Sequence, residues 1–308
     1  MQELSVIIIC ESALVSGGGE AVAIATALEL RARGVRVGYI AGNDKADPRL
    51  VEAGVELLLL DQQSFFEEPD RNVKLKKLKF NPKIDMPVME FMRKFDPDTT
   101  VVHAHTFRLK LSGRVPALFA DEGYVVFTHG HDYSPICPTS LYFNHRTGQN
   151  CKLKPLSMAC ITCECQGIPW RYKVPKLTSM FWNQKKALLN QRTTGFLYPS
   201  VLAQEVMMPF LPKDAQHHQF RPIGKDAPHQ RVHAENNKEV MFVGRVTHEK
   251  GPELLLQASE SLSIPVAIVG DGPLLKELKK KYPNARYTGW VPNDQMATEL
   301  AKARALVV

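Results

Sequence analysis

The chain has 308 residues, 44% of them hydrophobic, and its 39 Lys and Arg exceed its 32 Asp and Glu to give a net charge of +7. This composition suits a globular protein with a sizeable core and excludes a disordered or fibrous chain. No apolar run reaches the ~20 residues of a membrane span, and the apolar run at 4–10 has no basic flank of a signal peptide. We therefore expect a cytoplasmic protein whose basic charge favours an anionic partner.

The first part of the chain alternates short apolar strands with helices. A strand at 5–10 leads through the Gly-rich "VSGGGE" into a helix at 21–33 and a strand at 35–42, which together make a βαβ unit. Further strands are predicted at 55–61, 99–105, 124–130 and 194–200, with a helix at 86–95. Such alternation predicts a parallel sheet that is covered on both faces.

The segment from 209 to 237 is polar and reads as irregular, and the alternation restarts after it. Strands at 239–244 and 266–270 and helices at 252–262, 274–282 and 294–302 follow. In the helix at 252–262 we expect Leu254, Leu255, Ala258 and Leu262 to share the buried face.

We therefore predict an α/β protein with two Rossmann-like domains in series. The first spans 1–222, a linker spans 223–237, and the second spans 238–308. The chain stops inside the apolar run "ALVV", without a turn or polar tail, so we expect the second domain to be incomplete and the sequence to be a fragment or a natural truncation.

The segment "FVGRVTHEKGPELL" places two cations beside a helix start. A predicted strand ends at Gly244, Arg245 follows, and Lys250 precedes Gly251 and Pro252, a residue that suits a first helical turn. In parallel sheets this edge binds ligands, and a helix N-terminus offers free N–H donors to a phosphate.

The next strand ends in a second turn, formed by Gly270, Asp271 and Gly272. Two such turns at one sheet edge favour a nucleotide diphosphate as ligand. In the structural alternative the glycines only make tight turns and the two cations are solvated.

Four histidines, His103, His105, His129 and His131, end two predicted strands. They could form a metal site, but a His-x-His pair points both rings to one face only while the strand continues. We therefore favour hydrogen-bonded loop histidines for at least two of them.

Five of the six cysteines lie between 137 and 165. Cys137, Cys151, Cys160 and Cys163 can supply four thiolates to a structural Zn²⁺, which leaves Cys165 spare. The same ligands suit an iron–sulfur cluster, and reduced thiols packed in a long loop are a further alternative. Cys10 lies in the first strand and is predicted to be core.

Three motifs carry a family resemblance: "FVGRVTHEKG", "VAIVGDGPLLKEL" and "YTGWVPNDQM". In this order and spacing they resemble the C-terminal domain of GT-B glycosyltransferases of the retaining family 4 type (glycosyl transferases group 1), and residues 15–42 resemble the N-terminal domain. The resemblance implies a retaining hexosyltransferase that moves a sugar from a nucleotide-diphosphate sugar to a glycan or lipid-linked acceptor in polysaccharide biosynthesis.

The resemblance also implies roles for particular residues. Arg245 and Lys250, with Gly244 and the 270–272 turn, would neutralise the leaving diphosphate, so no catalytic metal is expected. Gly17, Gly18 and Gly19 would face the donor phosphate and the acceptor, and His131 and Asp132 would lie on the acceptor side, with His105 a weaker candidate. Segment 137–165 would be a zinc-bound insertion beside the acceptor.

The chain departs from the family in one respect. Family members continue past "ARALVV" into a Glu-x7-Glu segment that contacts the donor, and this sequence has none. We therefore expect little transfer activity from residues 1–308 alone.

Two other classes of protein compete with this reading. A zinc-containing nucleic-acid-binding protein would use the positive charge, but the basic residues lie outside the cysteine segment and we expect no nucleic-acid partner. An NAD-binding Rossmann protein would need G-x-G-x-x-G, which "SGGGEA" does not provide. Two basic stretches, 71–83 and 170–186, suit either a solvated face or peripheral contact with the inner face of a membrane.

Overall fold

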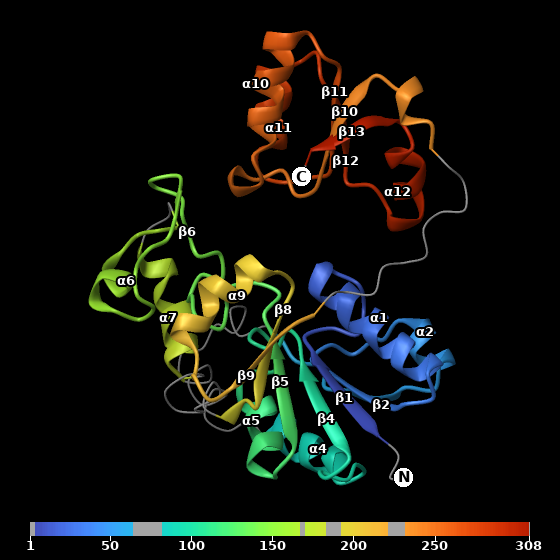
Figure 1. Ribbon diagram of the computed structural model, residues 1–308, viewed down its shortest axis with the longest axis vertical. Coiled ribbons are helices and arrows are strands. Elements are labelled where there is room, and N and C mark those ends of the chain that lie inside the picture. Colours follow the sequence, from blue (N-terminus) through green and yellow to red (C-terminus); the bar gives the residue numbers. More distant parts are fainter. Residues whose placement is uncertain (1–3, 64–81, 167–169, 183–191, 221–231, 308) are drawn as a thin grey trace. The chain divides into compact units, whose positions relative to one another are not determined.

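The computed structural model describes residues 4–63, 82–166, 170–182, 192–220 and 232–307. The chain forms two compact units, Met1–Gly224 and Lys225–Val308 (Figure 1). The boundary between them falls inside the segment for which the sequence predicts a linker.

The first unit is built on a seven-stranded sheet in the order β3-β2-β1-β4-β5-β8-β9, in which every neighbouring pair is parallel. The strands are β1 Ser5–Cys10, β2 Arg36–Ala41, β3 Glu56–Leu59, β4 Thr100–Ala104, β5 Val125–His129, β8 Gly195–Tyr198 and β9 Gln216–Gln219. This confirms the α/β class and the parallel sheet.

Strand β1 is buried along its whole length because helices cover both faces of the sheet. Ile7 and Ile9 belong to one core cluster, with side chains from α4 (Pro82–Met92) and α5 (Arg114–Asp121). Ile8, on the opposite face, packs in a second cluster with α1 (Gly18–Ala32) and α2 (Pro48–Glu52). Alternate side chains of a strand point to opposite faces, so a continuous apolar run fits this two-sided burial.

The strand order reverses at β1, which pairs with β2 on one side and with β4 on the other. In open α/β sheets a ligand site lies at such a reversal, beyond the carboxyl ends of the strands. The Gly-rich turn after β1 and the histidines that end β4 and β5 therefore come to the same edge.

The cysteine-rich segment leaves the sheet after β5 and returns at β8. It contains the hairpin β6 Phe143–Asn144 and β7 Gln149–Asn150, helix α6 Met158–Thr162, the 3₁₀ turn Trp170–Tyr172 and helix α7 Val174–Phe181. An open hollow beside it is lined by Asn144, Arg146, Thr147, Thr162, Cys163, Glu164 and Trp170.

One strand of the seven-stranded sheet was not predicted. After β8 come helix α9 (Val201–Met207) and the 3₁₀ turn Met208–Phe210, and then β9, which lies in the segment predicted to be irregular and pairs with β8. Its sequence, QHHQ, has no apolar alternation, because an edge strand can leave its side chains largely exposed.

The second unit has a four-stranded parallel sheet in the order β12-β11-β10-β13. Its strands are β10 Glu239–Val243, β11 Val266–Val269, β12 Arg286–Gly289 and β13 Ala303–Val307, and its helices are α10 Pro252–Leu262, α11 Leu275–Lys281 and α12 Asn293–Leu300, with 3₁₀ turns at Ala234–Asn236 and His248–Lys250. Residues of α10 and α11 pack in one core cluster, and residues of α12 pack against another.

The predicted buried face of α10 is partly wrong. Leu256 is 1% exposed, whereas Leu254 and Leu262 are 71% and 66% exposed. Three consecutive leucines at 254–256 point in directions about 100° apart, so periodicity alone cannot choose the face that packs on the sheet.

In the described ranges, no helix is long and apolar enough to cross a membrane. Of the first basic stretch, 71–81 lie outside the described residues. Of the second, 183–186 lie outside them.

Candidate functional site

In the C-terminal unit, the predicted phosphate-binding residues gather at the carboxyl edge of the sheet. Arg245 lies two residues after the end of β10, separated from it by Gly244. The chain then makes a tight turn in which Thr247 N–H donates to Arg245 O at 3.0 Å and Lys250 N–H donates to Thr247 O at 3.2 Å. Gly251, with a φ of 66°, caps the start of α10, and Pro252 occupies its first turn. Both cations thus flank the amino end of an 11-residue helix.

The second Gly-rich turn presses against this one. A Cβ on Gly270 would lie 1.9 Å from Gly244 O, and a Cβ on Gly272 would lie 2.4 Å from Val246 O. Val246 N–H donates to Asp271 O at 2.9 Å, and Leu274 N–H donates to Val246 O at 3.2 Å. The two turns lie side by side, and only residues without a side chain allow this backbone approach.

Arg245 and Lys250 are both exposed. Neither side chain has a hydrogen-bond or ion-pair partner among the residues that the structure describes. Between them lies Thr247, whose buried Oγ1 has no partner in the described part of the chain. Most buried polar atoms are paired, so this hydroxyl together with two uncommitted cations is suited to an anionic ligand.

Trp290 is a candidate that sequence reasoning missed. It comes directly after β12 at the same sheet edge and is 73% exposed. An exposed aromatic ring at this edge of the sheet could stack on a planar ring of a ligand. Its position after a predicted apolar segment was visible in the sequence, but its exposure was not.

In the N-terminal unit, Gly17–Gly19 open α1 without a side-chain cap. A Cβ on Gly19 would lie 3.1 Å from Thr106 Cγ2 and 3.7 Å from the ring of His131, whereas one on Gly18 would meet nothing within 4 Å. The turn therefore lies against His131, as two predicted site elements should. Of its three glycines, Gly19 has the closest packing against other segments.

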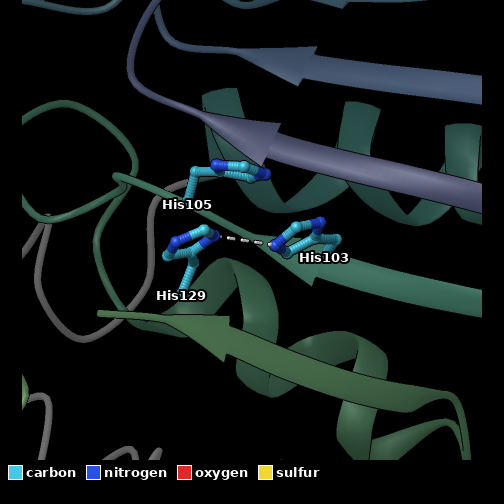
Figure 2. A group of neighbouring side chains, drawn as sticks. All are labelled: His103, His105 and His129. Carbon is cyan, nitrogen blue, oxygen red and sulfur yellow. Dashed lines mark hydrogen bonds between the residues drawn. The ribbon is translucent and has the colours of Figure 1, made fainter. Parts of the chain in front are cut away.

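The four histidines form a compact group. The rings of His129 and His131 stack with centroids 3.9 Å apart, and those of His103 and His105 are also 3.9 Å apart. His105 Nδ1 lies 2.8 Å from His131 Nε2, and His103 Nε2 lies 3.2 Å from His129 Nδ1 (Figure 2). The sequence expectation of hydrogen-bonded histidines is confirmed.

Burial keeps these imidazoles neutral. It lowers the pKa of His103 to about 3, of His129 to about 2 and of His131 to about 4. The pKa of His105 is also well below its usual value, because of burial and then the charges of the other three rings. The nearby Asp132 carboxylate opposes the shift at His131.

Asp132 is exposed and accepts a hydrogen bond from Ser134 N–H at 2.7 Å. A second carboxylate, missed in the sequence, lies after β1: Glu11 is 7% exposed and accepts from Leu109 N–H at 2.5 Å and from Lys110 N–H at 2.7 Å. Burial raises the pKa of Glu11 to about 7. A lone Glu at the end of an apolar strand gives no signal of this environment.

The cysteines of segment 137–165 occupy one region. A thiolate at Cys137 or Cys151 would raise the pKa of Cys160, which burial already raises, and Lys173, 2% exposed, donates from Nζ to Cys160 O and Cys163 O. Among the described residues, the potential metal ligands that lie within 4.8 Å of one another in a group of three or more are histidines. No cysteine belongs to such a group there. Zinc at the four cysteines therefore stays a prediction.

Solved structures with the same arrangement are glycosyltransferases. TarM matches 98% of this chain and 79% of its own with a TM-score of 0.59 at 9% identity. A glycosyltransferase from Rickettsia africae matches 98% of this chain and 72% of its own, with a TM-score of 0.58 at 13% identity. The lipopolysaccharide outer core galactosyltransferase WaaB matches 98% and 73%, with a TM-score of 0.53 at 13% identity. The chain thus has the α/β fold of GT-B glycosyltransferases, with two Rossmann-like units.

The sequence of the C-terminal unit matches a known family. Residues 225–308 match the model of the Glycosyl transferases group 1 family. A curated relative, the GDP-mannose-dependent alpha-mannosyltransferase of Corynebacterium glutamicum, is 31% identical over 162 residues, which are 49% of this chain. The match covers 38% of the relative's length.

Proposed function

We propose that the chain is part of a glycosyltransferase that moves a sugar from a nucleotide-diphosphate donor to a glycan or lipid-linked acceptor with retention of configuration. The observation that carries the proposal is the pair of exposed, uncommitted cations, Arg245 and Lys250, at the start of α10. Beside them the two Gly-rich turns pack backbone against backbone, and the free N–H groups at the start of a helix can bind a phosphate.

The charge of the leaving group gives these cations their role. When the sugar departs, negative charge develops on the diphosphate, and a fixed cation nearby stabilises the transition state more than the ground state. A charge-assisted hydrogen bond contributes about 1.5–3 kcal/mol. Arg245 and Lys250 can make such bonds without first breaking an ion pair in the described part of the chain.

On the N-terminal unit, His131 and Asp132 would contact the sugar or the acceptor. His131 lies against Gly19 and is held by His105, so its ring is fixed in direction. Because its pKa is lowered to about 4, His131 is neutral at physiological pH, and its ring nitrogen that does not contact His105 can form a hydrogen bond with a sugar hydroxyl.

The donor is the first point to test. The relative's name makes GDP-mannose the donor to try first, with UDP, ADP and NAD as comparisons. Binding is measured by calorimetry and by thermal shift of the full chain, and transfer by release of GDP in the presence of glycan acceptors. Stabilisation by NAD alone, or by an oligonucleotide alone, would reject the proposal in favour of the corresponding alternative.

Variants of the two cations test the site itself. We expect Arg245→Ala or Lys250→Ala to weaken GDP-mannose or GDP binding about 10-fold to 100-fold, the equivalent of one charged hydrogen bond. Lys276→Ala removes an exposed lysine of α11 and serves as the matched control. Equal affinities in all three variants would mean that the cations do not hold the diphosphate.

A lipid-linked acceptor would bring the enzyme to a membrane surface. Trp170, Tyr172 and Phe181 are 40%, 53% and 48% exposed, and the Arg171 guanidinium lies over the ring of Tyr172. Such a combination of aromatic and basic side chains suits the interface of an anionic bilayer. Flotation with anionic vesicles should recover the protein and should fail after Tyr172→Ser with Phe181→Ser. Equal recovery with neutral and anionic vesicles, or none with either, would reject this contact.

A further inference from the structure

We propose that His103, His105 and His129 form a binding site for one divalent transition-metal cation, with one imidazole nitrogen of each as ligand. One ligand atom from each residue lies within 4.8 Å of the other two, and Figure 2 shows the three rings converging from β4 and β5. The site does not depend on the proposed sugar transfer.

Backbone pairing explains why the rings converge. Strand β4 ends at Ala104, but His105 N–H still donates to Ile9 O at 2.8 Å and so continues the pairing with β1. His103 and His105 therefore stay on one face of the sheet. The register that pairs His103 with Phe127 and Ala104 with Thr128 brings His129 level with His105. The sequence left open whether the strand continues through His105, and this backbone pairing shows that it does.

Two of the ring nitrogens have no hydrogen-bond partner in the described part of the chain. They are the Nε2 atoms of His105 and His129, which are buried. Each of these two residues is 3% exposed. Buried polar atoms in proteins are nearly always paired, so such atoms call for a ligand. A metal cation accepts the lone pair of an unprotonated imidazole nitrogen directly.

The spacing suits a tetrahedral ion. Two nitrogens bound to one zinc at 2.0–2.1 Å lie about 3.3 Å apart. One nitrogen of each ring already lies within 4.8 Å of the other two, so this spacing can be reached by rotation of the side chains. Imidazole ligands suit Zn²⁺, Co²⁺, Ni²⁺ and Cu²⁺ rather than Mg²⁺ or Ca²⁺.

The surroundings of His105 resemble the support that metal-bound histidines have. If Nε2 binds the ion, Nδ1–H can donate to His131 Nε2, 2.8 Å away, and this bond fixes both rings. Phe220 packs its ring edgewise on His103 and His129 at 5.5 and 4.8 Å, which limits access of water on that side. An ion here would tie β4 to β5 directly beneath His131.

Cobalt distinguishes this site from the cysteines. The full chain is stripped of metal with a chelator and titrated with CoCl₂, because thiolate ligands give an intense near-ultraviolet charge-transfer band whereas imidazole ligands give visible ligand-field bands without it. We expect about one equivalent of imidazole-type cobalt per chain, displaced by Zn²⁺. His129→Phe should abolish it, and His218→Phe, an exposed histidine of β9, should leave it unchanged.

Cobalt-edge X-ray absorption on the unsubstituted chain gives a second readout if His129→Phe does not fold. An absence of nitrogen ligands, a spectrum with sulfur ligands alone, or a nitrogen contribution that His129→Phe leaves unchanged would each overturn the site.

Discussion

At the residue scale, the candidate phosphate site depends on glycines whose neighbours are backbone atoms. Gly270 has a φ of 137° and faces the carbonyl oxygen of Gly244, while Gly18 in the other unit faces open space. A sequence motif does not distinguish a glycine that faces backbone atoms from one that faces open space. Only the contacts reveal which of them the fold requires.

We predict that Gly270→Ala destabilises the C-terminal unit by about 3 kcal/mol, because its Cβ would lie 1.9 Å from a backbone oxygen at a φ unsuited to alanine. Gly18→Ala, inside α1 and clear of neighbours, should stabilise by up to about 1 kcal/mol through helix propensity. Chemical denaturation measures both. Equal stabilities of the two variants would contradict the close approach of the two turns.

Glu11 should make stability depend on pH. Its folded pKa of about 7 exceeds the ordinary 4.5, so the stability it contributes is complete below pH 4.5 and is lost as the pH rises through about 7. The loss amounts to about 3 kcal/mol, and Glu11→Gln should remove this part of the pH profile. Denaturation between pH 5 and 8 tests it, with Glu29→Gln, at an exposed pair with Arg33, as control. A profile that Glu11→Gln leaves unchanged would show that this carboxyl is already ionised.

At the element scale, α10 connects the phosphate site to the core of its unit. Its N-terminus faces the ligand edge, and Leu256 anchors it in the cluster with Ile268 and Leu278. The exposed Leu254 and Leu262 do not contribute to that anchor. The position of the N-terminus is thus fixed by one side of the helix.

Leu256→Ala should destabilise the protein by 2–4 kcal/mol, because it opens a cavity in a packed core. Leu254→Ala on the same helix should change the free energy of unfolding by less than about 0.5 kcal/mol. Urea denaturation monitored by circular dichroism compares them. If Leu254→Ala costs as much as Leu256→Ala, then Leu254 is buried in solution.

The cysteine-rich segment gives a second prediction at this scale. If zinc binds Cys137, Cys151, Cys160 and Cys163, purified protein contains thiolate-bound zinc, and Cys163→Ser lowers its content while Cys10→Ser, in the core of β1, does not. Elemental analysis with a thiol-specific cobalt band checks it. Protein that contains no thiolate-bound metal would contradict the zinc site. The hydrogen bonds of Lys173 and the hairpin would then stabilise the segment.

At the scale of the whole molecule, the net charge of +7 acts on any polyanion. We expect weak oligonucleotide binding at low salt that disappears near physiological ionic strength, because such binding depends on counterion release. Nucleotide binding at Arg245 and Lys250 should persist. Fluorescence anisotropy at two salt concentrations measures both, and salt-resistant, sequence-dependent oligonucleotide binding would instead support the nucleic-acid alternative.

The sequence by itself determined the α/β class, most strands of the two parallel sheets, the helices α1, α4, α10, α11 and α12, and the residues of the two Gly-rich turns. These features are local: apolar runs, glycines and a cation pair lie within a few residues of one another. It could not find β9, whose QHHQ sequence lacks alternation, or choose the buried face of α10 among three consecutive leucines.

The tertiary structure alone decided how distant residues meet. Glu11 is buried because the backbone after β4 closes over it, and His103, His105 and His129 converge because β4 keeps its pairing with β1 through His105 while β5 aligns in register beside it. Residues 26 positions apart are brought into contact by strand pairing, and pairing depends on the order and register of the whole sheet.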